Sequence, residues 1–465
     1  MQSRLAVQQI RTFTGLRTGV NVRTLTNPIP GKTPNIVSAD EALAVVQSGD
    51  NVYIHCAPST PTDLLKALAR HVEKNGLSNV RTHHLLTTGE VPWTDPKFAG
   101  KIRSNCFFVC SNLRPLVNTG KADYTPIFLQ DTIKVLDDKV KPVDVSLVTV
   151  SPPDSHGYCS IGVNVDMASA ACRNAKYVIG AMNKSQPKTF GDTFIHASQF
   201  HALVETDVPL PEVPSGKGTP EEAAIGKLIA ENLVDDYATL QLGIGSIPDN
   251  VLKLLIGHKD IGIHTELLCT GVMSLIEAGV VTNSRKSIDV GKCVTSFAMG
   301  NRKFYDLLND NTAFVFASAA YTNNFNVIAA QSRMTAINSA IEIDLAGQIV
   351  SDTIGKNYYS GFGGQVDFIN AAAQAADGKG KAIIALPSRT HKGQTKIVPY
   401  IKEGAGVVTT RAHTHYVVTE FGIANLFGKS VRQRAYELIK IAHPDDREAL
   451  DKAAFARFGV APSRD

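Results

Sequence analysis

The amino-acid sequence predicts an α/β fold made of two related domains with mostly parallel sheets. From residue 40 onward, short apolar runs alternate with helical patterns, an order typical of parallel-sheet proteins. The 465 residues also exceed what one compact domain usually holds. Four prolines and two glycines within 208–220 mark a linker. We therefore expect an N-terminal domain over 31–215 and a C-terminal domain over 220–465.

The elements follow from local patterns along the chain. Thr219 and Glu222 have the spacing of a capping box, so a helix should begin directly after the linker. Helical periodicity predicts, among others, helices at 61–74 and 221–233. Apolar runs of strand length predict strands at 52–56, 107–110, 143–150, 177–181, 240–244, 262–264, 314–318, 341–345, 382–386 and 416–419.

A faint internal repeat supports two related domains. Residues 54–61 lead into an apolar helix start at 64–68, and residues 243–248 lead into a similar start at 251–255. Both segments have the order strand, small-residue turn, proline and helix. The repeat predicts an active site in the cleft between the two domains.

The charge is unevenly distributed along the chain. Residues 1–39 contain five basic residues and no Asp or Glu, and removing these five from 47 leaves 42 basic against 43 acidic residues. The near-neutral remainder argues against nucleic-acid partners, and no apolar run is long enough to span a membrane. The basic, hydroxyl-rich start predicts a mitochondrial targeting segment at 1–30, with an ordinary basic tail as the alternative.

The seven cysteines contain no Cys-x-x-Cys pair and no regular spacing, which is typical of reduced thiols. His413 and His415 have no third ligand at metal spacing, so we expect no metal site.

Residues 240–250 combine a strand, a glycine turn and a helix start. Gly243 and Gly245 break the apolar run, and helical spacing resumes at 251–255. Such a turn exposes backbone N–H groups that can bind an anion. A tight packing turn is an equal alternative, because the third glycine of a dinucleotide fingerprint is absent.

Glu266 is the candidate nucleophile. It ends a short apolar strand, and a poorly hydrated carboxylate at the lip of an apolar cleft is more nucleophilic. A helix-capping or salt-bridging glutamate is the alternative. Glu420 is the rival nucleophile and ranks behind Glu266, and a reactive Cys269 is the less favoured interpretation of that thiol.

A second glycine cluster lies at 358–368. Its three glycines precede a helical segment, so they could bind a phosphate or polarise a carbonyl oxygen, or they could form a structural turn. Asn338 can both donate and accept, which suits a position against a substrate carboxylate or amide. Glu342 and Asp344 share one strand face, so their spacing fits an acid pair. A solvated strand face would explain the two acids equally well.

Several of these segments together resemble the acetyl-CoA hydrolase/transferase family. The resemblance is carried by 150–158, 243–249, 262–267, 336–342, 361–368 and 418–424. This family of class I CoA-transferases includes acetate:succinate and 4-hydroxybutyrate CoA-transferases. The resemblance covers essentially everything after the predicted targeting segment, so the two expected domains would be the N-terminal and C-terminal CoA-transferase domains.

The resemblance implies roles for individual residues. Glu266 would form an acyl-glutamyl anhydride and then a glutamyl-CoA thioester in a ping-pong transfer. No cofactor would be bound permanently, since coenzyme A is a substrate and part of the covalent intermediate. The positions implied to contact CoA are Gly243, Ile244, Gly245, Ser246, Ile247, Asn338, Gly361, Gly363 and Ser388.

The predicted mitochondrial targeting, with acetate and succinate as the acids expected there, favours transfer of CoA between acetyl-CoA and succinate. The expected partners are acyl-CoA, small carboxylates and a second copy of the chain in a homodimer. Acetyl-CoA hydrolysis and 4-hydroxybutyrate or butyrate transfer are alternatives, because water or another carboxylate can accept from the same intermediate. A catalytically silent CoA-binding protein is the non-enzyme alternative.

Overall fold

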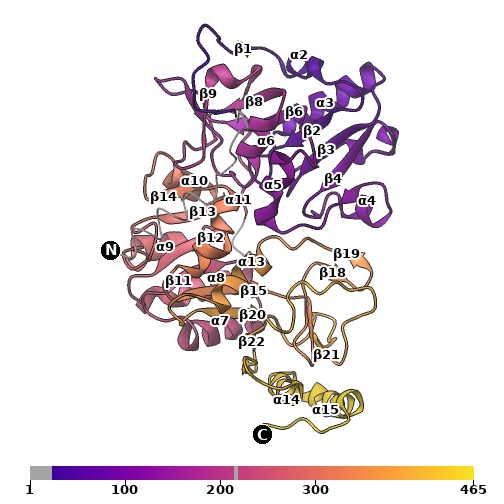
Figure 1. The fold of residues 1–465 in the computed structure, drawn as a ribbon, viewed down its shortest axis with the longest axis vertical. Helices are drawn as coiled ribbons and strands as arrows, with labels where there is room; N and C mark the ends of the chain where they lie inside the picture. Colours follow the sequence, from indigo (N-terminus) through magenta and orange to yellow (C-terminus); the bar gives the residue numbers. More distant parts are fainter. Residues whose placement is uncertain (1–22, 214–217, 244) are drawn as a thin grey trace. The chain divides into compact units, whose positions relative to one another are not determined.

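The structure is a computed structural model that describes residues 23–213, 218–243 and 245–465. The described residues form two compact units (Figure 1). The first unit contains 23–213 and 294–322, and the second contains the remaining described residues up to Asp465.

The first unit is built on an all-parallel sheet. Successive neighbours in this sheet pair in parallel throughout. In spatial order the strands are β1 (Asn35–Ile36), β10 (Ala202–Thr206), β8 (Tyr177–Asn183), β6 (Val145–Val150), β2 (Asn51–Ile54), β3 (Val80–His84), β4 (Ile102–Cys106) and β5 (Asp123–Tyr124). The helices are α2 (Ala39–Ala42), α3 (Thr62–Lys74), α4 (Arg114–Asn118), α5 (Thr132–Asp137), α6 (Ala168–Asn174), α10 (Arg302–Leu308) and α11 (Ala319–Thr322).

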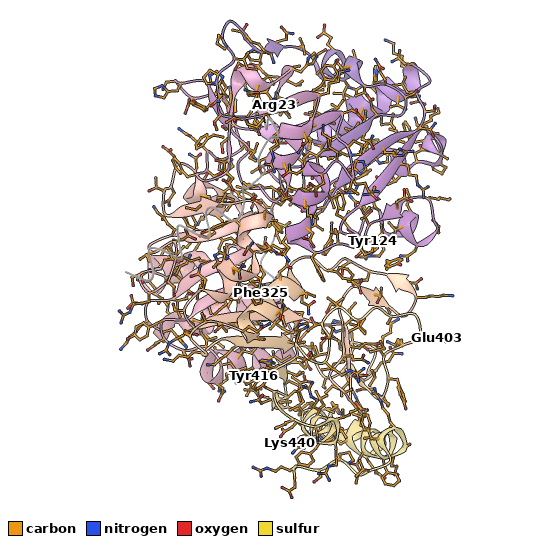
Figure 2. All side chains as sticks on the ribbon, in the orientation of Figure 1. Arg23, Tyr124, Phe325, Glu403, Tyr416 and Lys440 are labelled. Carbon is orange, nitrogen blue, oxygen red and sulfur yellow. The ribbon has the colours of Figure 1, made fainter. Side chains whose placement is uncertain are left out.

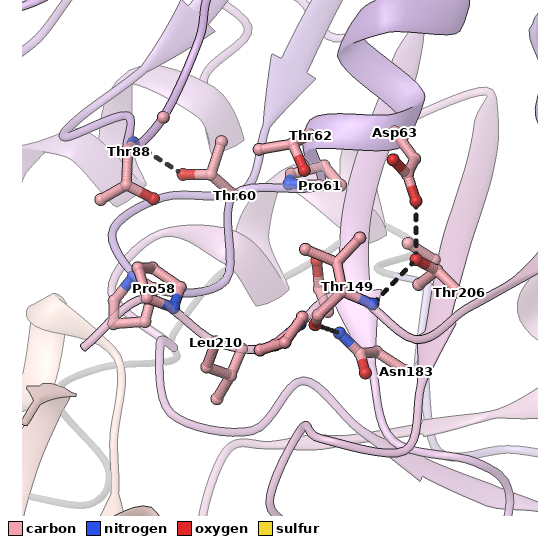
Figure 3. Close-up of a pocket in the computed structure, with 15 residues that line it drawn as sticks. Pro58, Thr60, Pro61, Thr62, Asp63, Thr88, Thr149, Asn183, Thr206 and Leu210 are labelled. Carbon is pink, nitrogen blue, oxygen red and sulfur yellow. Dashed lines mark hydrogen bonds between the residues drawn. The ribbon is translucent and has the colours of Figure 1, made fainter. Parts of the chain in front are cut away.

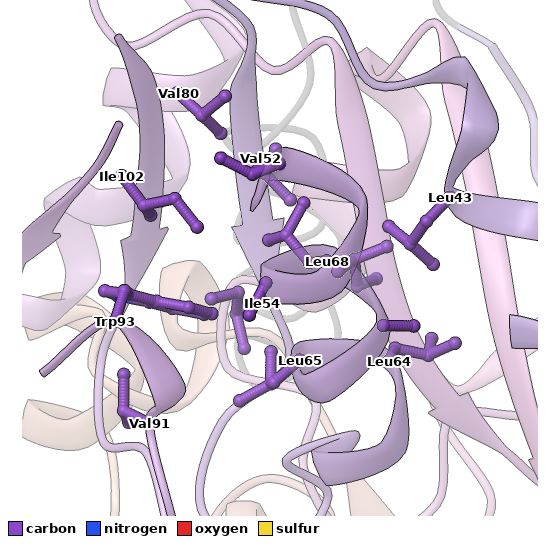
Figure 4. Packing of buried hydrophobic residues seen from close by; sticks show 14 of the residues in the cluster. Leu43, Val52, Ile54, Leu64, Leu65, Leu68, Val80, Val91, Trp93 and Ile102 are labelled. Atoms are coloured by element: carbon purple, nitrogen blue, oxygen red, sulfur yellow. The ribbon is translucent and has the colours of Figure 1, made fainter. Parts of the chain in front are cut away.

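Helix α3 shows how the pattern of the sequence builds the core. Leu64, Leu65, Leu68 and Val72 recur at helical spacing, and all four side chains are fully buried. Figure 4 shows the three leucines packed with apolar side chains of β2, β3 and β4. Truncating one such leucine to alanine would cost about 2–5 kcal/mol.

Polar contacts tie Arg23, the first described residue, to the rest of the first unit. Arg23, labelled in Figure 2, donates from Nε to Gln199 Oε1 at 2.8 Å. A short antiparallel pair, β7 (Tyr158–Ser160) and β9 (Phe194–His196), lies outside the main sheet.

Residues 294–322 join the first unit, although the linker at 208–220 predicts one continuous domain over 220–465. The segment carries most of β13 (Cys293–Met299) and all of β14 (Phe314–Phe316). Backbone hydrogen bonds explain the difference: Val165 N–H donates to Ser296 O, and Ala319 N–H donates to Asp166 O, both at 2.9 Å. Long-range pairing of this kind is not readable from linker composition.

The second unit repeats the strand order of the first. Its strands run β12 (Gly262–Cys269), β11 (Thr239–Leu242), β15 (Met334–Ser339), β20 (Lys381–Ala385) and β22 (Tyr416–Thr419), with β23 (Gly422–Asn425) antiparallel to β22. This order matches β3, β2, β6, β8 and β10 of the first unit. The predicted α/β class with mostly parallel sheets is therefore confirmed.

The remaining elements of the second unit cover and extend its sheet. The helices are α7 (Pro220–Asn232), α8 (Ser246–Leu254), α9 (Val272–Glu277), α12 (Phe325–Ala329), α13 (Gln365–Ala373), α14 (Val431–Lys440) and α15 (Pro444–Phe458). Two small sheets contain β17 (Ile349–Val350), β16 (Glu342–Asp344) and β21 (Ile397–Val398), and the hairpin β18 (Thr353–Ile354) and β19 (Asn357–Tyr358). The predicted capping box opens α7, because Glu222 N–H donates to Thr219 Oγ1 at 3.3 Å and Thr219 N–H to Glu222 Oε2 at 2.8 Å.

Two strand predictions need correction. Residues 107–110 form no strand; β4 ends at Cys106, and the apolar run after it is buried in a loop. The strand predicted at 262–264 extends through Cys269 as β12, so Glu266 lies within the strand and not at its end.

Candidate active site

The carboxyl ends of β11 and β15 form a switch point in the second sheet. From β11 the chain continues to β12 on one side, and it later adds β15 on the other. In open α/β sheets, ligands bind beyond the carboxyl ends of strands at such a point. The predicted CoA platform follows β11, and Asn338 lies near the end of β15.

The turn between β11 and α8 has the predicted form. Gly243 N–H donates to Ile337 O at 3.2 Å, and Gly245 has φ 123°, a conformation that favours glycine. Helix α8 then begins at Ser246, which is partly buried, while Ile247 is buried. The N–H groups of its first turn have no intrahelical acceptors. Ile244 lies outside the described residues, and CoA binding by this turn stays a prediction.

Asn338 is held by a reciprocal amide pair. Its Nδ2 donates to Gln241 Oε1 at 2.9 Å, and Gln241 Nε2 donates to Asn338 Oδ1 at 3.4 Å. The pair joins β15 to β11 at the switch point, and Asn338 remains partly exposed there.

Glu266 lies on the strand next to the glycine turn. The hydroxyl of the preceding Thr265 accepts from Leu242 N–H at 3.3 Å, which aligns Glu266 with the residues that follow β11. The Glu266 side chain is partly buried, and its Oε2 accepts a hydrogen bond from Asn323 Nδ2 at 3.0 Å. A charge-assisted donor of this kind fixes the carboxylate in one orientation.

The second glycine cluster approaches the same carboxylate. Gly364 caps α13, and a Cβ built there would overlap both Glu266 Oε2 and Asn323 Nδ2. Glycine is therefore required at 364 by close approach. Gln365 Nε2 donates to Ser339 O at 3.4 Å, which brings the start of α13 to the end of β15. Gly363 has φ 53°, in the left-handed region, and Gly361 is buried.

Ser388 lies with Glu420, at the ends of β20 and β22. Its N–H and its hydroxyl both donate to the Glu420 carboxylate, at 2.9 and 2.5 Å, and the serine is fully buried. Burial lowers the pKa of the nearby Lys396 ammonium to about 8, an effect that the Glu222 and Glu420 carboxylates oppose. The described contacts place Ser388 in this cluster and not against Glu266.

Glu342 and Asp344 do not form a solvated face. Both side chains are buried, and each accepts a cation: Lys402 at 3.1 Å for Glu342 and Arg457 at 3.0 Å for Asp344. The two acids are structural.

The first unit has a cavity of about 160 Å³ at the carboxyl ends of its parallel strands (Figure 3). Its polar side chains are bonded within the unit: Thr206 Oγ1 donates to Asp63 at 2.7 Å, and Asn183 Nδ2 donates to Val208 O at 2.7 Å. The apolar wall includes Pro58 and Leu210. Asp63 and Asn183 are thus engaged in bonds that hold the wall of the cavity together.

Other classes of site find no support in the described ranges. Among the residues with assigned positions, no group of three or more His, Cys, Asp or Glu side chains is arranged to hold a metal ion. Within that same part of the chain, no helix has the length and apolar character to cross a membrane.

Sequence reasoning missed Asn323, Asp367 and Gly364 as neighbours of Glu266. Asn323 precedes the N-cap of α12 in a run of asparagines, and the following Asn324 gives the same local signal as a helix cap. Gly364 and Asp367 lie inside the glycine motif, but only the fold reveals which members of the motif meet Glu266.

Comparisons with known proteins cover most of the chain. The family models described as the acetyl-CoA hydrolase/transferase N-terminal and C-terminal domains match residues 33–214 and 300–454. The succinyl-CoA:acetate/propanoyl-CoA:succinate CoA transferase of Fasciola hepatica is 47% identical, over 94% of this chain and 91% of that protein. The 4-hydroxybutyrate coenzyme A transferase of Clostridium kluyveri is 42% identical, over 91% and 98%.

A solved structure with the same fold is similar over nearly its whole length. The crystal structure of RipA from Yersinia pestis superposes with a TM-score of 0.85 at 34% identity, over 92% of this chain and 98% of that one. Both the sequence and the fold of the chain are thus matched almost end to end.

Proposed function

The chain belongs to the acetyl-CoA hydrolase/transferase family and is a CoA-transferase, and from that premise we propose that it moves CoA between acetyl-CoA and succinate through a glutamyl-CoA thioester on Glu266. The observation that carries the proposal is the Glu266 carboxylate held by Asn323 at 3.0 Å, beside the glycine start of α13. A fixed, partly buried carboxylate with a matched amide donor is suited to nucleophilic attack.

The proposed reaction begins at the thioester carbonyl. A Glu266 oxygen attacks that carbon, the C–S bond breaks, and an acyl-glutamyl anhydride and CoA thiolate form. The thiolate then attacks Cδ of Glu266, acetate leaves, and the glutamyl-CoA thioester remains. Succinate attacks this thioester and the same steps run in reverse, so succinyl-CoA leaves and the Glu266 carboxylate is restored.

The surrounding donors have a defined task in these steps. During attack on Cδ, negative charge develops on a Glu266 oxygen, and the Asn323 N–H is already directed at Oε2. The first turn of α8, which begins at Ser246, would supply backbone N–H groups for the CoA moiety. Binding of the remote part of CoA would help to offset the cost of forming an anhydride.

The choice of acetate and succinate as the two carboxylates that exchange CoA is supported by the name of the Fasciola hepatica relative. The test is to supply acetyl-CoA with and without succinate and to follow succinyl-CoA and free thiol separately. Transfer predicts succinyl-CoA formation in step with acetyl-CoA loss, and little free thiol without an acceptor. Equal thiol release with and without succinate would establish hydrolysis, and a faster rate with 4-hydroxybutyrate or butyrate would change the substrate.

The proposal includes a mitochondrial setting and a homodimer. The acid-free, basic segment before residue 40 supports import. Fusing residues 1–39 to a fluorescent protein tests import directly, and light scattering of the purified protein tests the dimer.

A further inference from the structure

The amide of Asn323 lies between two carboxylates. Its Nδ2 donates to Glu266 Oε2 at 3.0 Å and to Asp367 Oδ2 at 3.1 Å. An amide nitrogen carries two hydrogens, so each acid receives one of them.

The two acids determine which end of the amide faces Glu266. The amide oxygen and nitrogen have nearly the same shape, so only their partners select the orientation. A reversed amide would place Oδ1 against both carboxylates, and Asn323 and Asp367 are both buried, where such repulsion is poorly screened. Oδ1 itself is buried and, among the described residues, has no hydrogen-bond partner, so the orientation is not set by a gain at that atom.

Glu266 cannot hold the amide throughout the proposed cycle. As an anhydride or a thioester it is neutral, and its attraction for the N–H groups is then weaker. Asp367 is not consumed in these steps and stays in place as an acceptor for the Asn323 amide. It is the third residue of α13, and α13 begins directly after Gly364, the cap that approaches Glu266. The helix therefore fixes the position of Asp367.

We propose that Asp367 is a positioning residue that keeps the Asn323 N–H directed at Glu266 while Glu266 carries the acyl group or CoA. The inference rests on the proposed function, because it assumes a covalent stage on Glu266. Asp367 acts through Asn323 and not on the substrate.

A double-mutant cycle with Asp367→Asn and Asn323→Ala tests the inference. Asp367→Asn preserves the shape of the side chain, but its new amide can donate to Asn323 Oδ1 and so accommodates the reversed orientation. We expect Asp367→Asn to lower kcat about 100-fold, with KM for acyl-CoA changed less than about threefold. In the Asn323→Ala background the same substitution should change kcat less than about threefold, since the group it positions is gone.

Equal losses in the two backgrounds, or wild-type kcat in Asp367→Asn, would overturn the proposal. Asp377→Asn is the matched control, because Asp377 caps a surface turn after α13 by accepting from Arg333 and Lys379 N–H groups. Thermal unfolding reports whether each variant folds. If Asp367→Asn does not, Asp367→Ser, which removes the charge without adding an amide, enters the same cycle.

Labelling of the wild-type protein separates this inference from the proposed function. After acetyl-CoA and borohydride, absence of reduction at Glu266 in the wild type contradicts the covalent mechanism itself. Reduction at Glu266 in the wild type, together with one of the overturning kinetic results, contradicts only the role of Asp367.

Discussion

Ser388 donates twice to Glu420, through its N–H at 2.9 Å and its hydroxyl at 2.5 Å. Two donors from one buried residue tie this carboxylate into the ends of β20 and β22. Glu420 is thus engaged structurally, whereas Glu266 meets Asn323 at the start of a glycine-capped helix.

Glu420→Gln is expected to affect stability more than chemistry. A hydrogen bond to a charged acceptor contributes about 1.5–3 kcal/mol, so the neutral amide should lower the free energy of unfolding by about 1–2 kcal/mol. Denaturant unfolding measures this loss. Reduction at Glu266 after acetyl-CoA and borohydride should persist in the variant, and its disappearance would favour Glu420 as the nucleophile.

Gly364→Ala is expected to abolish most activity. The new Cβ would overlap Glu266 Oε2 and Asn323 Nδ2, and displacement of a reacting group can cost about 100-fold in kcat. Gly257→Ala is the control, since a Cβ there meets no atom within 4 Å. Steady-state kinetics of both variants decide the matter, and equal activity would show that the close approach at 364 is not needed.

Cys269 is expected to be unreactive. Burial, with a smaller contribution from the Asp249 carboxylate, raises the pKa of its thiol to about 12. The nucleophilic thiolate is therefore scarce at neutral pH. N-ethylmaleimide should modify Cys269 much more slowly in the folded protein than in guanidinium. Cys269→Ala should retain CoA transfer, and rapid inactivation that this variant resists would contradict the prediction.

Lys286 should make the free energy of unfolding rise with pH above neutrality. Burial lowers the pKa of this ammonium from 10.5 to about 8, and its Nζ donates to Ile263 O at 3.0 Å and Lys292 O at 2.8 Å. Between these pKa values the unfolded chain binds more protons, so the contribution of Lys286 to stability rises with pH. From about pH 8 to about pH 10 the rise is on the order of 2 kcal/mol.

Comparison with Lys286→Met isolates this effect. The difference in unfolding free energy between wild type and Lys286→Met should grow in favour of the wild type as the pH rises. Lys259→Met, which replaces an exposed lysine, should show a constant difference. A constant difference for Lys286→Met as well would show that its pKa is not lowered by folding.

The sequence predicted the class of fold and the parts of the site that are local in the chain. The glycine turn between β11 and α8 could be predicted, because glycine spacing and helical periodicity are local signals. The length of β12 could not be read from the local pattern: the strand runs on to Cys269, past the predicted end, so Glu266 lies within it. The contact of Asn323 with Glu266 joins residues 57 positions apart and depends on packing alone.

The most direct test of the account is to map the covalent intermediate. The protein is incubated with acetyl-CoA, treated with borohydride and digested for mass spectrometry, with Glu266→Gln as the test variant and the exposed Glu277→Gln as its control. We expect reduction of a thioester to an alcohol at Glu266 in the wild type and in Glu277→Gln, and loss of both reduction and transfer in Glu266→Gln. Reduction at Glu420, labelling at Cys269, or unchanged transfer in Glu266→Gln would contradict it.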